Sequence, residues 1–225
     1  MTGNLGERAA ARLHIAPEGV LIVLVGGAVA LFILMLGPLW LGVPIVVVAA
    51  GVGAFFRDPE RQSSAPPDAF LSAADGKVCD VSEAPLPDAS KALYRRVAVF
   101  MSPLDVHVNR ASVSGKVTAI EHKSGAFRAA FRDDANEHNE RNTILFRAAD
   151  GRAYAIVQIA GYLARRIVCR VRPSEQVMRG DRIGLIMFGS RVDHFFPLDY
   201  RVVVKLGDRV QAGVTVLGEV VDGCH

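Results

Sequence analysis

The chain has 225 residues, 51% of them hydrophobic and 22% charged, with a mean hydropathy of +0.27. This composition is too apolar for an ordinary soluble domain and too charged for a protein that lies wholly in a membrane, so we expect one membrane part and one soluble part. The formal net charge of +3 is a mild basic excess. It suits an anionic lipid surface or an ordinary solvated face equally, and it excludes the strongly basic class of nucleic-acid-binding proteins.

The first organised segment, residues 19–56, contains no charged residue. A helix needs about 20 residues to cross the hydrocarbon core, so this segment has room for nearly two crossings. Gly37-Pro38 at its middle favours a helix break, which predicts a transmembrane or membrane-embedded helical hairpin with spans over 20–36 and 39–56. The alternative is a shallow hairpin in one leaflet, since Pro44 and the short first span make a double crossing marginal.

Basic residues flank the hairpin on both sides, with Arg8 and Arg12 before it and Arg57 and Arg61 after it. The positive-inside tendency therefore places both ends in the cytoplasm, with the hairpin in the cell inner membrane. A signal peptide is disfavoured because the apolar run is too long and no clear cleavage site follows it.

The chain changes character after residue 56. We expect residues 1–56 to be the tail and membrane hairpin, 57–69 a polar, proline-rich linker, and 70–225 a β domain. Short apolar runs broken by glycine turns predict an all-β sandwich or barrel. The expected strands are 77–78, 97–100, 115–120, 127–131, 142–146, 154–159, 182–186, 200–204 and 214–217.

Two Gly-Asp-Arg turns, at 180–182 and 207–209, resemble those of the flattened β-sandwich of biotinyl and lipoyl domains (the barrel-sandwich fold). The alternative is that Gly-Asp is merely a common hairpin turn. No lysine has the hairpin-tip setting of a cofactor carrier, so we expect the fold without the carrier function.

The three cysteines, Cys79, Cys169 and Cys224, have unrelated spacings, without a CxxC or a Cys/His zinc pattern. We expect reduced core or terminal residues in a cytosolic compartment. No metal site is predicted.

The pair Gly189-Ser190 lies between an apolar run at 183–188 and the apolar residues Val192, Phe195 and Phe196. A serine becomes a carbonyl cofactor only if its hydroxyl attacks the preceding peptide carbonyl, and a glycine there leaves the carbonyl open and the backbone free to adopt a strained angle. Most Gly-Ser pairs are turns, but polar turns do not usually have such apolar surroundings. We interpret Gly189-Ser190 as a bond that the chain cuts in itself.

Three motifs occur in order: Ala74-Asp75-Gly76, Phe100-Met101-Ser102-Pro103-Leu104-Asp105-Val106-His107-Val108-Asn109-Arg110, and Phe188-Gly189-Ser190-Arg191-Val192-Asp193. Together they resemble phosphatidylserine decarboxylase, specifically its short bacterial and archaeal branch, over about residues 55–217. In the longer branch the cleavage motif reads Leu-Gly-Ser-Thr, so Arg191 is a departure, although it does not touch the reacting atoms.

The resemblance implies self-cleavage into a large chain that ends at Gly189 and a small chain of 225 − 189 = 36 residues. Ser190 would become a covalent pyruvoyl group, the cofactor that accepts electrons as phosphatidylserine in the membrane loses carbon dioxide to give phosphatidylethanolamine. The two chains of one precursor are then partners, and homo-oligomer formation is left open.

The resemblance also implies an Asp-His-Ser set, which maps onto Asp75, His107 and Ser190 as catalytic residues. Histidine suits the removal of the serine proton, and a carboxylate holds the imidazole in the right tautomer. The longer branch has a second histidine three residues beyond the first, where this chain has Arg110. Either His107 serves both cleavage and decarboxylation, or another residue covers one step.

His138 and His194 are the remaining candidates for that step, though a surface or structural role suits both better. His122 is weaker still, at a charged strand end. For each of these histidines the sequence alone leaves the choice open.

Three other functions are compatible with parts of the pattern. A membrane-anchored lipoyl-like adaptor without catalysis would usually have a long coiled-coil hairpin, and no sustained heptad occurs here. A zinc peptidase would need clustered ligands, but there is no HExxH or His-x-His. A serine hydrolase would need Gly-x-Ser-x-Gly, and Ser190 is followed by Arg-Val-Asp instead.

Overall fold

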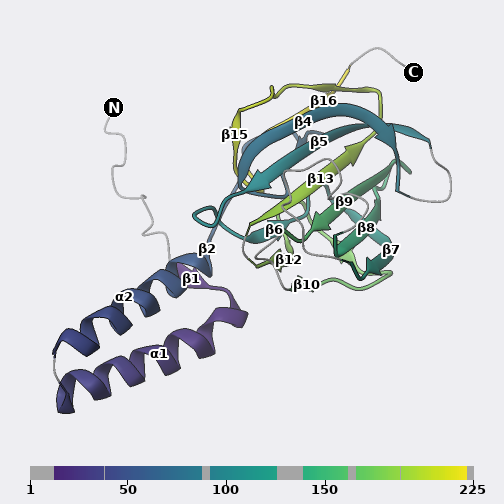
Figure 1. Ribbon diagram of the computed structural model, residues 1–225. Coiled ribbons are helices and arrows are strands. Elements are labelled where there is room, and N and C mark those ends of the chain that lie inside the picture. Colours follow the sequence, from purple (N-terminus) through teal and green to yellow (C-terminus); the bar gives the residue numbers. More distant parts are fainter. Residues whose placement is uncertain are drawn as a thin grey trace, which may run out of the picture. The chain divides into compact units, whose positions relative to one another are not determined.

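Figure 1 shows the computed structural model of the chain. It describes residues 13–37, 39–87, 92–125, 139–161, 166–187 and 189–221. The chain forms two compact units, residues 1–60 and 61–225.

The first unit contains two apolar helices, α1 (Pro17–Leu36) and α2 (Leu39–Phe55). They run antiparallel, since a Cβ on Gly26 would lie 3.5 Å from the Cβ of Ala49 and one on Gly53 would lie 3.7 Å from Val23. The predicted helices and the break between them are therefore confirmed. In the described residues, α1 is long and apolar enough to span a membrane, while α2 is shorter, so the double crossing stays a prediction.

Short strands close the base of this hairpin. β1 (Leu13–Ile15) pairs antiparallel with β2 (Arg57–Pro59), and the Ala16 amide donates to the Phe56 carbonyl at 2.8 Å. The first residues of the expected linker are thus part of a strand pair.

In its described residues, the second unit contains strands and no helix. Its largest sheet in the described residues has eight antiparallel strands and curls on itself (Figure 1). In sheet order the strands are β11 (Gln176–Val177), β7 (Gly115–Lys123), β8 (Arg141–Arg147), β9 (Ala153–Ile159), β13 (Ser190–Phe196), β5 (Leu93–Met101), β4 (Gly76–Pro85) and β15 (Arg209–Val210).

Two smaller sheets complete the core. One has the order β10 (Ile167–Cys169), β12 (Arg182–Ile186), β6 (Val108–Arg110), and the other β14 (Tyr200–Val202), β16 (Val216–Val220), β3 (Phe70–Leu71). Side chains from all three sheets share one buried cluster, which includes Val99, Ile183, Val192 and Leu217. The all-β prediction is confirmed, whereas the likeness to biotinyl and lipoyl domains stays a prediction.

Strand β13 lies in the middle of the large sheet, and all seven of its residues are buried. This strand was not predicted from the sequence, in which charged residues and a histidine stand among its apolar residues. Val192 and Phe196 face the core, while Phe195 belongs to a second apolar cluster on the other face, which we call the outer face. The outer face also carries Arg191 and Asp193, and these charged residues are buried as well, so both faces of the strand are covered.

Most predicted strands coincide with observed ones, and 182–186 matches β12 residue for residue. The expected strand 77–78 is only the start of the ten-residue β4. The expected strand 127–131 lies outside the described residues. The predicted turns at Gly180 and Gly207 are present, each glycine with a positive φ.

Two of the cysteines lie in the described part of the chain, and both are free. Cys169 is half-buried, but Cys79 is exposed because it lies on the outer side of β4, so the expectation of a core position was wrong for Cys79. Cys224 lies outside the described residues.

Candidate active site

Asp75 and Ser190 lie at the same end of three neighbouring strands of the large sheet, β4, β5 and β13. Phe100 on β5 pairs with Lys77 on one side and with Arg191 on the other. One residue further along, Ser190 pairs with Met101. Asp75 immediately precedes β4, so strand register brings the first and third sequence motifs to the same end of the sheet (Figure 1).

Gly189 has a φ of +60°, in the left-handed region that glycine adopts without strain. Apart from its chain neighbours, no atom of the described residues lies within 4 Å of the place where a Cβ would stand, so they leave space beside the peptide. Ser190 follows as the first residue of β13 and is fully buried. Its hydroxyl donates to Met101 Sδ at 3.4 Å. A thioether is a weak acceptor, so this contact does little to hold the hydroxyl.

His107 is buried and lies beside the segment that leads to Gly189. The Ile186 amide, at the end of β12, donates to the His107 carbonyl at 3.4 Å. His107 Nδ1 lies 2.9 Å from the Asp105 carbonyl oxygen. Because a carbonyl only accepts, Nδ1 carries the proton in this contact and Nε2 is the basic nitrogen of the neutral ring.

Asp75 has partners other than the expected histidine. Its carboxylate forms a two-pronged ion pair with Arg61, one prong being Nη2 to Oδ2 at 2.7 Å, and it accepts the Ala212 amide at 2.8 Å. Among the described residues, its hydrogen bonds go to Arg61 and Ala212 and none goes to His107. From the sequence, Arg61 was predicted to lie in the linker.

Gly76, the residue after Asp75, is required by close packing. Its φ is +150°, and a Cβ there would lie 2.1 Å from the Phe100 carbonyl oxygen. A side chain at this position would push β4 away from β5. Glycine at position 76 therefore allows β4 to begin directly after Asp75.

His194 has a structural role. It is fully buried on β13, its Nε2 accepts the Ala73 amide at 2.8 Å, and its Nδ1 donates to the Val97 carbonyl at 2.9 Å. Burial lowers its pKa to about 4, although the Val97 carbonyl and Asp193 act in the opposite direction. A neutral ring with both nitrogens engaged is not a base for Ser190, and it holds the Ala73 segment that precedes Asp75.

A chain of buried amides leads to the same site and was not anticipated. Asn142 Nδ2 donates to Gln158 at 2.9 Å, and Gln158 Nε2 donates to Asn109 Oδ1 at 2.8 Å. Asn109 Nδ2 lies 3.4 Å from the Ala73 carbonyl and 3.7 Å from Met101 Sδ. A glutamine inside an otherwise apolar strand, β9, was the signal in the sequence.

The remaining candidates lie elsewhere. His122 is half-exposed, with Nε2 3.5 Å from Glu140. Arg110, which replaces the second histidine of the longer branch, is buried and donates to the Gly180 carbonyl at 2.9 Å. His138 lies outside the described residues. In the part of the chain that the structure describes, no group of three His, Cys, Asp or Glu side chains is arranged to hold a metal ion.

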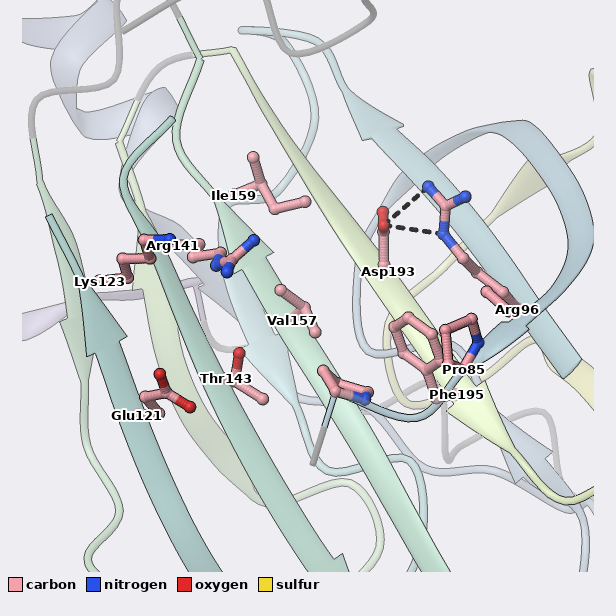
Figure 2. A pocket seen from close by; sticks show the side chains of 12 residues that line it. Pro85, Arg96, Glu121, Lys123, Arg141, Thr143, Val157, Ile159, Asp193 and Phe195 are labelled. Carbon is pink, nitrogen blue, oxygen red and sulfur yellow. Dashed lines mark hydrogen bonds and ion pairs between the residues drawn. The ribbon is translucent and has the colours of Figure 1, made fainter. Parts of the chain in front are cut away.

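The outer face of the large sheet carries a pocket of about 540 Å³, which Figure 2 shows. Lys123 and Arg141 lie on one side of it, Asp193 and Arg96 on the other, with Val157 between them. The Ser190 hydroxyl contacts Met101 in the core, so it does not face this pocket.

The family model for phosphatidylserine decarboxylase matches residues 48–218 of this chain. The chain is 47% identical over 164 residues to a phosphatidylserine decarboxylase proenzyme of Magnetococcus marinus, covering 73% of this chain and 75% of the relative. It is 40% identical over 205 residues to the proteins of the same name from Burkholderia multivorans and Syntrophus aciditrophicus, covering 91% of this chain and 95% and 96% of those relatives.

Proposed function

Because this chain belongs to the phosphatidylserine decarboxylase family, we propose that it converts phosphatidylserine to phosphatidylethanolamine with a pyruvoyl group that it makes from its own Ser190. The names of its relatives describe a proenzyme, which agrees with a chain that must be processed before it works. The observation that carries the proposal is the geometry of one peptide bond: Gly189 in a left-handed conformation with open space beside it, joined to a buried serine.

Cleavage begins with attack of Ser190 Oγ on the Gly189 carbonyl carbon. The C–N bond breaks, the nitrogen takes a proton, and Gly189 is left as an ester on the serine oxygen. A base then removes the Cα proton of residue 190, the Cα=Cβ double bond forms, and the bond between that oxygen and the Ser190 Cβ breaks, which releases Gly189 as a carboxylate. Water replaces the nitrogen of the remaining dehydroalanine, so ammonia leaves and a pyruvoyl group remains on Arg191.

His107 is our candidate for the base. Nδ1 donates to the Asp105 carbonyl, so Nε2 is the basic nitrogen of the neutral ring. The His107 carbonyl accepts the Ile186 amide at the end of β12, three residues before Gly189. His194 is excluded from this task by its two contacts and its low pKa. We therefore assign the proton transfer at Ser190 Oγ to His107.

Asp75 remains a candidate catalytic residue, and Arg61 joins it. The Arg61 guanidinium neutralises the Asp75 carboxylate just before β4. Met101 and Ser190 lie at the same end of the sheet. Orientation of His107 by Asp75 would require the carboxylate to change partners. In the uncut chain, the Asp105 carbonyl fixes the imidazole instead.

The site residues fit a pyruvoyl group, because that group replaces Ser190 with atoms of nearly the same size in the same strand. Residue 190 is fully buried against Met101, so the group needs no added space. A conjugated carbonyl supplies an acceptor for the electrons released when a carboxylate leaves as carbon dioxide. Burial of Ser190 also means that lipid reaches this position only after the chain opens at Gly189.

We propose that the α1–α2 hairpin anchors the enzyme in the cell inner membrane with the β domain on the cytoplasmic side. Support comes from the apolar composition of α1 and from the arginines on both sides of the hairpin. Exposed large side chains such as Leu21, Phe32 and Trp40 are suited to lipid. The substrate is itself a membrane lipid, so anchoring keeps enzyme and substrate in the same phase.

Intact-mass spectrometry of the purified chain tests the proposal. Two chains divided at Gly189-Ser190, the smaller blocked by pyruvoyl, are expected from the wild type, together with formation of phosphatidylethanolamine from phosphatidylserine in mixed micelles. Ser190→Ala lacks the attacking oxygen and should stay at full length and inactive. Ser114→Ala, at a serine that accepts the Arg179 amide elsewhere on the domain, is the matched control.

A wild-type chain that stays in one piece and releases no carbon dioxide would instead favour a membrane-anchored adaptor. Cleavage of the Ser190→Ala variant would place the cut at another bond.

A further inference from the structure

A buried cluster of charges begins at Arg191, the residue that follows Ser190 after the proposed cut. Arg191 Nε donates to Asp193 Oδ1 at 2.7 Å, and its Nη2 donates to Oδ2 at 3.2 Å. The same Asp193 Oδ2 accepts Arg96 Nε at 3.0 Å and lies 2.9 Å from Arg96 Nη2, as Figure 2 shows. One carboxylate on β13 thus lies between two guanidinium groups, one from its own strand and one from β5.

The cluster reaches a third strand and is balanced in charge. Arg96 Nη1 donates to Asp80 Oδ2 on β4 at 3.2 Å, and Ser82 donates to the same oxygen at 2.6 Å. Two arginines face two aspartates, so the cluster is neutral as a whole. It links β13, β5 and β4 on the outer face of the sheet. Ser190 and Asp75 lie at the nearby end of these strands.

Burial makes this arrangement specific. The Asp193 and Arg191 side chains are 4% and 5% exposed, and that of Arg96 is 16% exposed. Any other arrangement of these groups would leave a charge without a partner in a poorly solvated place, which is costly. Paired arginine and carboxylate groups therefore hold residues 191 and 193 in one geometry.

The backbone explains why residue 190 needs such support. Ser190 pairs with Met101 on β5, but pairing with β9 begins only at Arg191, which is opposite Ile159. Before cleavage, residue 190 is also held by its bond to Gly189. Afterwards that bond and the amide of residue 190 are gone, and strand ends held on one side fray.

We infer that Arg191, through its buried pair with Asp193 and Arg96, is the positioning residue that holds the new chain end, and with it the pyruvoyl group, in the mature enzyme. This inference rests on the proposed cleavage at Gly189-Ser190. It gives a role to the residue at which this chain departs from the cleavage motif of the longer branch. The Arg191 side chain binds Asp193 on the outer face, whereas the Ser190 hydroxyl contacts Met101 in the core, so Arg191 acts through the strand that carries residue 190.

The role implies a difference between the two stages of the enzyme's life. In the precursor, residue 190 is tethered on both sides, so cleavage should tolerate the loss of Arg191. In the mature enzyme the strand end is free, so turnover should be slowed by the loss of Arg191. A displacement of about 1 Å at a reacting group can cost on the order of 100-fold in rate.

The test uses the full-length chain in detergent micelles. Arg191→Met removes the charge, and Arg191→Lys keeps the charge but cannot donate two parallel hydrogen bonds to one carboxylate. Arg201→Met is the matched control, since Arg201 is 70% exposed and pairs with Glu219 on the surface. Intact mass gives the fraction cut and the pyruvoyl content, and phosphatidylethanolamine formation gives kcat and KM. A cut chain also shows that the variant folds.

For Arg191→Met we expect full cleavage, a kcat lower by roughly 10- to 100-fold and a KM within about twofold of the wild type. Arg191→Lys should lie between the two, and Arg201→Met should match the wild type. An unchanged kcat in Arg191→Met, or cleavage slowed as much as turnover, overturns the positioning role alone. An uncut wild-type chain refutes the proposed function and this inference with it.

Discussion

His194 makes the stability of the β domain depend on pH in a predictable direction. The neutral ring accepts a hydrogen bond from the Ala73 amide at Nε2 and donates one to the Val97 carbonyl at Nδ1. Protonation of Nε2 would bring its N–H group into repulsive contact with the Ala73 amide N–H, in the buried core. Burial accordingly lowers the pKa of His194 to about 4, against 6.5 for an unperturbed histidine.

The sign follows from proton binding. Between pH 6.5 and about 4, the unfolded chain binds a proton at His194 that the folded chain does not. Stability is therefore complete above pH 6.5 and falls as the pH drops towards 4. The two pKa values imply a loss of about 2 kcal/mol at pH 5 and about 3 kcal/mol at pH 4 from this one side chain.

The assay is urea unfolding of the full-length chain in micelles, followed by near-ultraviolet circular dichroism from pH 4 to pH 7.5. Ser190→Ala provides the background, so that the chain stays in one piece. His194→Gln in that background keeps an amide in the core but cannot titrate. Carboxylates titrate in both proteins, so their effects cancel in the difference between the two curves.

We expect the variant to be less stable than its parent at pH 7.5, because glutamine cannot reproduce both ring contacts. The gap should narrow by about 3 kcal/mol as the pH falls to 4. Parallel curves, with a constant gap over the whole range, would show that His194 does not titrate with folding and would refute the reasoning.

Three further predictions concern processing and the membrane. Gly189→Ala places a side chain at a φ of +60°, which costs roughly 1–2 kcal/mol, so a time course of intact mass should show slower cleavage; an unchanged rate would show that this conformation is not needed. His107→Ala should block cleavage if it is the single base, and Asp75→Asn should impair the same step, whereas two chains with normal turnover in His107→Ala would return this histidine to a structural role. Deletion of residues 1–56 should leave a domain that still cuts itself but works poorly on phosphatidylserine vesicles, and undiminished activity there would show that the hairpin is not the main anchor.

The amino-acid sequence by itself was sufficient for the local features of this protein. Helices α1 and α2 follow from an apolar run with Gly37-Pro38 at its middle, since that pattern needs no distant partner. The pair Gly189-Ser190 stood out for the same reason, because the left-handed conformation of Gly189 depends on its missing side chain.

Tertiary structure decided which side chains share the site. Asp75 pairs with Arg61, a residue that reads as linker, and His194 reaches Val97 and Ala73, which are 97 and 121 residues away in the chain. Strand β13 was missed because its charged residues find their partners on β5 and in the strand itself. Such contacts depend on the order and the register of the strands in the sheet. Period-two alternation in the sequence predicts which face of a strand is buried, but it does not predict which strand lies beside it.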